Sequence, residues 1–324
     1  MSTRVAVLDD YQRVAHRYAD WQSLPAEVEF LHEHIGDREE LIARLEPFQV
    51  VAAMRERTAF PREVLEALPN LRLLVTTGMR NASIDVQAAR ELGIVVAGTG
   101  SSGAADSSWA PTAELAWGLI FALARDIPAE DREIRRGGWQ RGVGLELGGR
   151  TLGVLGLGRL GTRVAEVGRA FGMDVIAWSS NLTEERAQQA GARLVEFGEL
   201  FESSDVLTIH TVLSKRTRGL VGAAELARMK PTAYLVNTSR GPIVDETALR
   251  EALHAGRLGG AGLDVFGREP LPADDPWRDT PRTVLTPHLG YVTEGTYEKF
   301  YAETVEDIAA FLAGSPVRVI NQYE

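Results

Sequence analysis

The chain has 324 residues, of which 44% are hydrophobic and 25% are charged, a composition typical of a folded protein with about two domains. Its formal net charge of −10 argues against a basic surface for nucleic acid or for an anionic membrane. The absence of cysteine excludes disulfides, thiolate metal sites and thiol nucleophiles. We therefore expect small molecules and other protein chains as partners, and neither nucleic acid, membrane nor a bound metal.

The N-terminus, Met1 to Asp10, lacks the basic and apolar segments of a signal peptide. The most apolar stretch, Leu115 to Ala124, is too short to span a bilayer. Together with the missing cysteines, these features predict a soluble protein of the cytoplasm.

Short aliphatic runs alternate with helical patterns in the first part of the chain, for example the helical patterns Arg38 to Leu45 and Pro61 to Ala67. The aliphatic runs predict buried strands at Val5 to Leu8, Val28 to Leu31, Val50 to Ala53, Leu73 to Thr76 and Ile94 to Val96. This alternation indicates one α/β unit with a parallel sheet.

A second α/β unit is predicted after the Gly-rich turn Gly142 to Gly149. Its strands are expected at Thr151 to Leu155, Asp174 to Trp178, Val206 to His210, Ala233 to Asn237, Gly260 to Asp264 and Val284 to Thr286. Helical patterns fill the gaps, so each unit should be a parallel sheet covered by helices.

The small-residue segment Gly98 to Asp106 precedes a long apolar helical pattern, Pro111 to Arg125, and we expect the chain to cross between the domains there. Near the end of the chain, hydrophobic residues recur at helical spacing. They are Phe300, Val305, Ile308 and Leu312. We expect this last helix to pack back on the first domain.

Gly156, Gly158 and Gly161 stand in G-x-G-x-x-G spacing between a predicted strand and an amphipathic helix, with Arg159 and Leu160 between the last two glycines. The first glycine permits a tight turn, the second lets the backbone approach a pyrophosphate, and the third lets the helix pack against the strand. The bare motif arises by chance in Gly-rich turns, but this context predicts a dinucleotide site at a helix N-terminus.

The strand that follows ends in Ser179 and Ser180, where NAD sites usually carry an acidic residue for the adenosine ribose. A carboxylate about 4 Å from a 2′-phosphate would cost about 4 kcal/mol at an effective dielectric of about 20, so its absence removes an obstacle to NADP. No Lys or Arg lies between Ser179 and Asn181 to hold that phosphate. The sequence therefore predicts NAD or NADP as cofactor, with a slight preference for NADP.

Three side chains follow predicted strands of the second unit and suit hydride transfer to a 2-oxo acid. Arg240 has the planar fork that binds a carboxylate, and His288 titrates where proton transfer at neutral pH is efficient. Glu269 could pair with His288 and stabilise its imidazolium. Taken alone, each has a simpler explanation: a surface ion pair, a structural histidine or a solvated loop carboxylate.

The segments Asn237 to Gly241, Gly262 to Pro270 and Thr286 to Gly290, in this order behind the glycine motif, resemble the D-isomer-specific 2-hydroxyacid dehydrogenase family. The resemblance covers nearly the whole chain. It implies that Arg240 binds and polarises the substrate, that Glu269 supports the histidine, and that His288 is the acid/base.

The resemblance also implies further binding positions. Backbone around Gly78 and Met79 would hold the substrate carboxylate, and Arg55 would lie near the substrate unless it forms a fold-supporting salt bridge. Tyr291 departs from the small residues that the family commonly has there, so it would either narrow the substrate pocket or pack beneath it. The cofactor-side positions would be Thr112, His210, Thr211, Thr238 and Asp264, besides Ser179 and Ser180, with Asp264 near the nicotinamide carboxamide.

The family fold implies two Rossmann-like doubly wound parallel-sheet domains with a cleft between them. Residues 1–104 plus 293–324 would form the substrate domain, and residues 105–292 the dinucleotide-binding domain. The family also implies a homodimer, for which the apolar helix from Pro111 would supply the surface unless it packs between the domains.

Two alternatives stay open. A formate dehydrogenase of this fold usually pairs its histidine with Gln, so Glu269 favours the hydroxyacid enzyme. A non-catalytic, NAD(H)-responsive corepressor-type protein would keep the same three side chains. Because the chain ends at Glu324, we expect no C-terminal regulatory domain. The side chain of the 2-hydroxy acid is left open.

Overall fold

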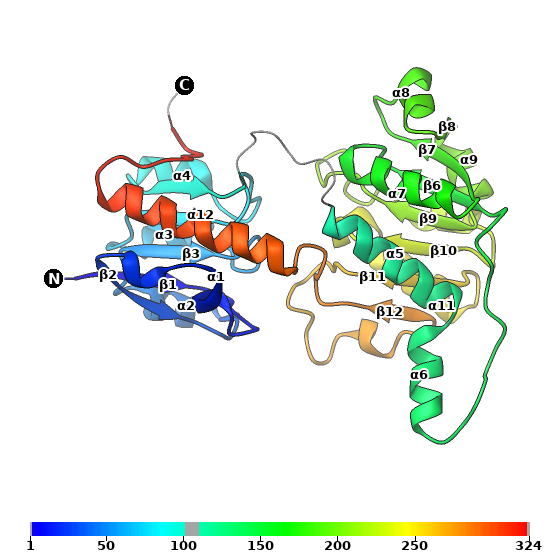
Figure 1. Ribbon diagram of the computed structural model, residues 1–324, viewed down its shortest axis with the longest axis horizontal. Helices are drawn as coiled ribbons and strands as arrows, with labels where there is room; N and C mark the ends of the chain where they lie inside the picture. The colour runs from blue at the N-terminus through cyan, green and yellow to red at the C-terminus, as the bar shows by residue number, and fades with distance from the viewer. Residues whose placement is uncertain (1, 101–109, 323–324) are drawn as a thin grey trace. The chain divides into compact units, whose positions relative to one another are not determined.

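The computed structural model describes residues 2–100 and 110–322, and the chain divides into two compact units. Unit 1 comprises Met1–Asp106 and Thr293–Glu324, and unit 2 comprises Ser107–Val292. Each unit is built on a parallel sheet with helices on its faces (Figure 1). We expected the chain to cross between the domains at Gly98 to Asp106, and this segment lies outside the described residues from position 101 onward.

The sheet of unit 1 has the order β2-β1-β3-β4-β5. Its strands are β1 (Thr3–Val7), β2 (Ala26–Phe30), β3 (Val50–Ala53), β4 (Leu73–Thr76) and β5 (Val95–Gly98). β3 and β4 are buried along their whole length, as strands covered by helices on both faces require. Val7, Ala52, Val75 and Ala97 pair in one row, so the loops after these strands emerge at one edge.

The helices of unit 1 are α1 (Ala15–Tyr18), α2 (Arg38–Leu45), α3 (Arg62–Glu66), α4 (Val86–Glu91) and α12 (Glu294–Leu312), with a 3-10 turn η1 (Trp21–Ser23). α2 begins where the Asp37 carboxylate accepts the Glu40 N–H at 2.9 Å. α12 contacts α1, β4 and β5, which confirms that the last helix packs on the first unit.

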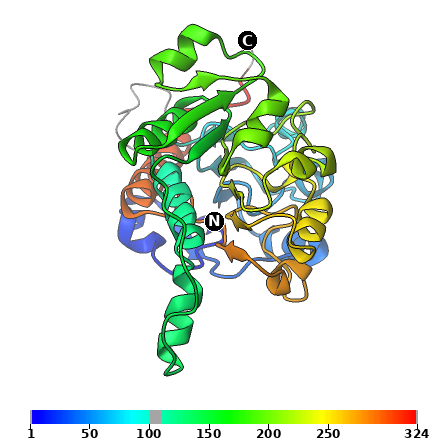
Figure 2. The same ribbon diagram turned by 90° about the vertical axis from the view of Figure 1, so that its right-hand side faces the viewer.

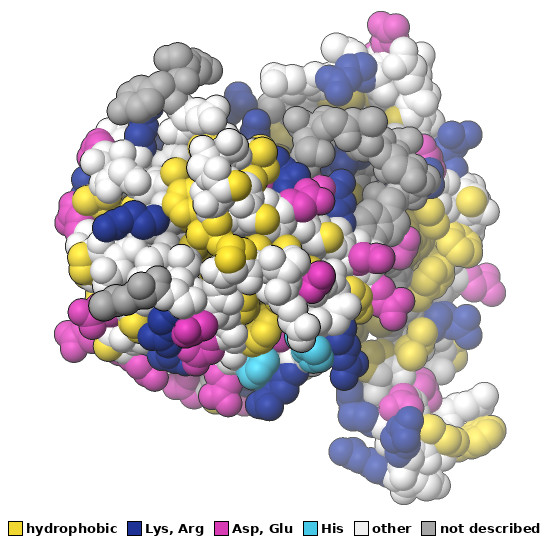
Figure 3. Space-filling model, turned by 60° about the vertical axis from the view of Figure 1, so that its left-hand side comes forward, with side chains coloured by type: hydrophobic (Ala, Val, Ile, Leu, Met, Phe, Trp, Pro, Cys, Tyr) yellow, Lys and Arg dark blue, Asp and Glu magenta, His cyan; other side chains and the backbone are white. Residues whose placement is uncertain are grey.

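Figure 3 brings the unit 1 side of the molecule forward. Acidic and basic side chains intermix there around apolar ones, and a surface of mixed sign does not resemble the basic stripe of a nucleic-acid binder. None of the helices in the described part of the chain has both the length and the apolar character needed to cross a bilayer.

The sheet of unit 2 has the order β12-β11-β10-β9-β6-β7-β8. Its strands are β6 (Thr151–Leu155), β7 (Asp174–Trp178), β8 (Arg193–Leu194), β9 (Val206–Ile209), β10 (Tyr234–Asn237), β11 (Gly260–Leu263) and β12 (Thr283–Leu285). The strand order reverses between β6 and β9, the switch point where ligands of doubly wound sheets bind.

The helices of unit 2 are α5 (Pro111–Ala124), α6 (Ile127–Arg135), α7 (Arg159–Ala170), α8 (Glu184–Gln189), α9 (Phe197–Ser203), α10 (Ala223–Arg228) and α11 (Glu246–His254), with 3-10 turns η2 (Gly241–Ile243) and η3 (Pro276–Asp279). Val175 and Ala177 face one core cluster and Ile176 the other, because successive strand residues point to opposite faces. α5 packs on α7, β10, β11 and β12 of its own unit, where Ala116 and Ile120 are fully buried.

Figures 1 and 2 show α6 and the chain that follows it standing off the body of unit 2. Ile127 and Ile134 of α6 are about half exposed, and Trp139 beyond it is 72% exposed. We call residues 127–143 the arm.

Candidate functional site

The strands of unit 2 end in one row, in which Leu155 pairs with Trp178 and Ile209, and Asn237 pairs with Ile209 and Leu263. Apart from Thr112 on α5, every predicted catalytic or cofactor-binding residue of unit 2 lies in a segment that follows directly after this row. These segments hold Gly156 to Gly161, Ser179 and Ser180, His210 and Thr211, Thr238 to Arg240, Asp264 to Glu269, and Thr286 to Tyr291. The fold therefore gathers them at one edge of one sheet.

Close packing explains two of the motif glycines. Gly156 has φ +103°, and a Cβ there would lie 2.7 Å from the Thr211 backbone nitrogen. A Cβ on Gly161 would lie 2.1 Å from the Gly156 carbonyl oxygen, so only glycine lets α7 meet the loop. Gly158 differs, because a Cβ there would meet nothing within 4 Å. The space above Gly158 is open to a ligand.

The start of α7 leaves its amide groups available. α2, α8 and α11 begin at a side chain that accepts a helix N–H, whereas the N-cap of α7 is Gly158 and no side chain caps it. Nearby at the end of β10, the buried hydroxyl of Thr238 has no hydrogen-bond partner among the described residues. Free amides at a helix N-terminus and an orphaned hydroxyl fit a phosphate-bearing dinucleotide.

The other predicted residues around the glycine loop differ in exposure. Ser179 is half-buried, and its Oγ accepts the Leu157 N–H at 2.9 Å, so this hydroxyl supports the loop. Ser180 and Arg159 are exposed, and Leu160 is half-buried.

His210 follows β9 beside the glycine loop. Its Nε2 lies 2.8 Å from the Thr208 Oγ1. Burial lowers the pKa of His210 to about 4, so its ring is neutral at neutral pH. The neighbouring Thr211 carbonyl accepts the Ser239 hydroxyl, which links the loops after β9 and β10.

Glu269 and His288 form a direct pair in which Glu269 Oε2 lies 2.5 Å from His288 Nδ1. The second carboxylate oxygen, Oε1, accepts the Phe266 N–H at 2.9 Å. The side chains are 27% and 17% exposed, so the pair is shielded from water without being sealed. This bond fixes the ring and leaves Nε2 to meet a reacting oxygen.

Asp264 holds the loop that carries His288. Its Oδ1 accepts the Thr286 hydroxyl at 2.6 Å and the Leu289 N–H at 2.7 Å, and its Oδ2 accepts the Gly290 N–H at 2.9 Å. Burial raises the pKa of the Asp264 carboxyl, and these hydrogen bonds oppose that shift. The carboxylate expected beside a nicotinamide thus contacts residues 286–290, and Thr112 donates to the Gly290 carbonyl at 2.8 Å.

Arg240 lies beyond β10, one strand away from β11. Its Nη1 donates to the Ser239 carbonyl at 2.8 Å. The next residue, Gly241, packs so closely on Phe266 that a Cβ would lie 2.1 Å from the Phe266 carbonyl carbon. The loop of Arg240 therefore touches the loop of Glu269. Tyr291 lies edge-on to the His288 ring, with centroids 5.4 Å apart.

The predicted substrate residues of unit 1 also meet one another. Gly78 has φ +96°, and a Cβ there would overlap the Arg55 guanidinium, which lies against it. Arg55 Nη1 donates to the Thr77 carbonyl at 3.1 Å. The Gly78 N–H donates to the Thr99 hydroxyl at 3.0 Å, and Met79 is half-buried beyond it.

Two supporting residues were not predicted. Thr99 accepts the Gly78 N–H, and Glu246 at the start of α11 accepts the Gly267 N–H at 2.7 Å in the loop of Glu269. The only sequence signal for Glu246 is a carboxylate in the first turn of a helix, which many helices have for other reasons.

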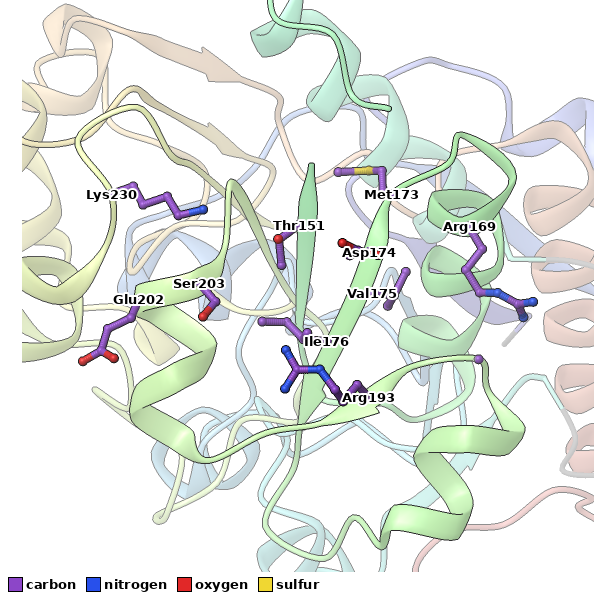
Figure 4. A pocket seen from close by; sticks show the side chains of 11 residues that line it. Thr151, Arg169, Met173, Asp174, Val175, Ile176, Arg193, Glu202, Ser203 and Lys230 are labelled. Carbon is purple, nitrogen blue, oxygen red and sulfur yellow. The ribbon is translucent and has the colours of Figure 1, made fainter. Parts of the chain in front are cut away.

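A hollow of about 830 Å³ lies at the other end of the strands, near the starts of β6, β7 and β8 (Figure 4). Its cations are Arg169, Arg193 and Lys230, of which Arg193 pairs with Glu199 and Lys230 with Asp205. None of the residues predicted for the site lines this hollow. Within residues 2–100 and 110–322, no three His, Asp or Glu side chains are arranged to hold a metal ion.

Comparison with known proteins relates the chain to a described family. Residues 117–290 match the model of the D-isomer specific 2-hydroxyacid dehydrogenase, NAD binding domain. The chain is 39% identical over 270 residues to a glyoxylate reductase of Aeropyrum pernix, covering 80% of this chain and 79% of that protein. A crystal structure of phosphoglycerate oxidoreductase from Vibrio cholerae superposes with a TM-score of 0.89 at 34% identity, covering 97% of this chain and all of that one.

The chain is also 39% identical over 283 residues to a D-3-phosphoglycerate dehydrogenase of Archaeoglobus fulgidus, with 87% of this chain covered. That match covers 53% of the relative, and a second such dehydrogenase, from Methanocaldococcus jannaschii, is covered to 52%. The chain spans about half the length of these relatives.

Proposed function

Because this chain belongs to the D-isomer-specific 2-hydroxyacid dehydrogenase family, we propose that it transfers hydride between a nicotinamide cofactor and a small 2-oxo acid or D-2-hydroxy acid. The observation that carries the proposal is the 2.5 Å pair of Glu269 and His288. It stands at the strand ends that also carry Arg240 and the glycine loop.

The assigned roles follow from the charge of each group. Arg240 binds the substrate carboxylate and polarises the carbonyl. His288 delivers a proton to the new alkoxide during reduction and accepts it during oxidation, and Glu269 stabilises the protonated ring. When bound, the nicotinamide cofactor supplies or receives the hydride.

The two units take different parts. Residues 105–292 contain the NAD(H)-binding domain of the family, and we assign the cofactor phosphates to Gly158 and the start of α7. We assign substrate binding to residues 1–104 plus 293–324, through Arg55 and the turn at Gly78 and Met79. Arg55 is a second cation, which suits an acidic or phosphorylated substrate tail, and its Nε lies 3.6 Å from Glu56 Oε2, an ion pair that such a tail would share.

Ser179 supports acceptance of both cofactors with a slight preference for NADP, because no carboxylate stands there to repel a 2′-phosphate. Its hydroxyl already accepts the Leu157 N–H, so its remaining lone pair and proton are the groups left for a ribose.

The first experiment follows NADH and NADPH absorbance with glyoxylate, hydroxypyruvate, pyruvate and phenylpyruvate. We expect turnover with at least one of these acids, and we expect His288→Ala to lower the rate by a factor of about 100 or more while NADH binding persists. Turnover by the variant near the wild-type rate would refute the role of His288.

Other outcomes decide the alternatives. A wild-type protein that binds NADH and reduces none of a broad panel of 2-oxo acids would point to the corepressor-type scaffold. Formate oxidation in place of oxo acid reduction would point to the formate enzyme. A preference for NAD of about 100-fold, about 2.7 kcal/mol, would overturn the preference for NADP.

We also propose that the protein is a homodimer. α5 packs on its own sheet. The support for a homodimer therefore comes from the arm, which exposes Ile127, Ile134, Trp139 and Val143. The arm carries both Arg132 and Glu133, and mixed charges suit a two-fold interface in which one surface meets its own copy.

A further inference from the structure

Residues 317–321 form a strap along the edge of the unit 1 sheet. Val319 bridges Ala97 of β5 in antiparallel orientation, and the Ile320 N–H donates to the Val96 carbonyl at 2.7 Å. The strap therefore extends the sheet past β5 and covers an edge that would otherwise expose unpaired backbone groups.

Side chains at both ends of the strap secure it. Asn321 Oδ1 accepts the Val96 N–H at 2.9 Å, and Asn321 Nδ2 donates to the Ile94 carbonyl at 2.8 Å. At the other end, Arg318 Nε donates to the buried Asp307 of α12 at 2.9 Å. Arg318 has φ +50°, so these bonds hold a backbone conformation that is unfavourable for a residue other than glycine.

The side chain of Ile320 lies against Gly98, which also packs on the turn assigned to the substrate carboxylate. A Cβ on Gly98 would lie 2.7 Å from Ile320 Cδ1, 2.7 Å from the Gly78 carbonyl oxygen and 3.2 Å from Met79 Cα. The Gly98 position is therefore enclosed by the strap on one side and the turn on the other, and only a hydrogen atom fits. The turn also contacts the Arg55 guanidinium at Gly78.

We propose that the strap is a positioning element for the Gly78–Met79 turn, and that Ile320 thereby sets the affinity for the substrate. This inference rests on the proposed function, in which backbone of this turn binds the carboxylate. Ile320 is a positioning residue, since it acts through Gly98 and the turn. Small displacements of a binding turn weaken substrate binding without removing any catalytic group.

Two variants disturb the packing between Ile320 and Gly98 in opposite ways. Ile320→Ala removes the packed side chain, and Gly98→Ala inserts a Cβ that overpacks it. Gly36→Ala is the matched control, because a Cβ there would meet the His34 ring at an ordinary 3.6 Å. Both test variants should raise KM for the 2-oxo acid about tenfold, the change that about 1.4 kcal/mol produces. Their kcat and the dissociation constant of NADH should stay close to wild type.

Hydrogen exchange gives a readout independent of turnover. In wild type the Gly78 N–H donates to the Thr99 hydroxyl and the Thr77 N–H to the Ala53 carbonyl, so both amides should be protected. Ile320→Ala should speed exchange at residues 77–79 about tenfold, which corresponds to about 1.4 kcal/mol of lost local stability, with the melting temperature nearly unchanged.

Exchange at residues 77–79 that stays at the wild-type rate in Ile320→Ala overturns the strap proposal, whatever happens to KM. Faster exchange together with an unchanged KM also overturns it, because the turn would then move without affecting the substrate. If the wild type reduces no oxo acid, the proposed function fails, and with it the claim that Ile320 sets the affinity for the substrate. Faster exchange in Ile320→Ala would still demonstrate that Ile320 holds the turn.

Discussion

Glu269 is held at both carboxylate oxygens, by the Phe266 N–H and by His288 Nδ1. Glu269→Gln keeps the shape and one acceptor oxygen but removes the negative charge. A hydrogen bond to a charged group contributes about 1.5–3 kcal/mol, so the imidazolium should lose stabilisation of that order. The acid limb of the pH profile for hydroxyacid oxidation should therefore move down by about 1–2 pH units, since each unit corresponds to about 1.4 kcal/mol.

The measurement is kcat/KM for oxidation between pH 4 and pH 9, the range in which a histidine base loses its proton. Glu202→Gln is the matched control, because Glu202 pairs with Arg228 on the surface of the same unit. An acid limb that stays in place in Glu269→Gln would mean that the Glu269 charge does not stabilise the protonated His288.

The candidate triad could be predicted because each member follows a strand that the sequence reveals. Asp264 was expected near the nicotinamide, but its hold on the His288 loop and the role of Glu246 could not be predicted, because both depend on the paths of loops. Asp264 receives hydrogen bonds from Thr286 and Leu289, 22 and 25 residues away. Glu246 bonds Gly267 across 21 residues. Nothing in the local pattern distinguishes these carboxylates from solvated ones.

The loop between β6 and α7 and the first turn of α7 carry two glycines with different surroundings, Gly158 and Gly161. In Gly161→Ala, the Cβ would lie 2.1 Å from the Gly156 carbonyl oxygen, so α7 must move away from the loop. Overpacking of this kind costs about 1–3 kcal/mol. We expect thermal unfolding to show a lower melting temperature and NADH titration to show weaker binding.

Gly158→Ala is predicted to behave differently, because its Cβ meets no protein atom within 4 Å. The melting temperature without cofactor should match wild type, while the dissociation constant of NADH should rise about tenfold, or about 1.4 kcal/mol, because the methyl group occupies the approach to the pyrophosphate. NADH binding at wild-type strength would contradict the phosphate role of Gly158.

At the scale of elements, the sequence predicted every long strand, since aliphatic runs between turn residues identify buried parallel strands. β3, β4, β6 and β7 have the predicted bounds, and the bounds of the other predicted strands differ by at most two residues. β8 was missed because two residues carry no periodicity. α6 was missed as well, since its exposed Ile127 and Ile134 face no core of their own chain.

Across the whole chain, the return of the C-terminus to unit 1 was predicted for α12, whose apolar residues recur at helical spacing. The strap beyond it was not, because Arg318 and Asn321 act through hydrogen bonds to residues more than 200 positions away or to α12. For α5 the sequence predicted a dimer surface or packing between domains, and the structure adds its packing on β10 and β11.

The arm is the region from which the oligomeric state can be tested. A hollow of about 580 Å³ lies among Ile127, Ile134 and Trp139, and in the proposed homodimer a second copy fills it. Burying a large apolar side chain contributes about 1.5–3 kcal/mol, and two-fold symmetry counts each residue twice. Trp139→Asp should therefore weaken the dimer by about 3–6 kcal/mol and shift the mass measured by light scattering to that of a monomer.

Leu92→Asp is the control, because Leu92 is 41% exposed on unit 1, away from the arm in sequence. It should leave the dimer mass unchanged. A monomeric wild type would contradict the homodimer, and a Trp139→Asp variant that stays dimeric at micromolar concentration would place the interface elsewhere.

The arm contains none of the proposed catalytic or binding residues, so monomeric Trp139→Asp should still bind NADH. Loss of that binding would show that dimerisation supports the cofactor site as well.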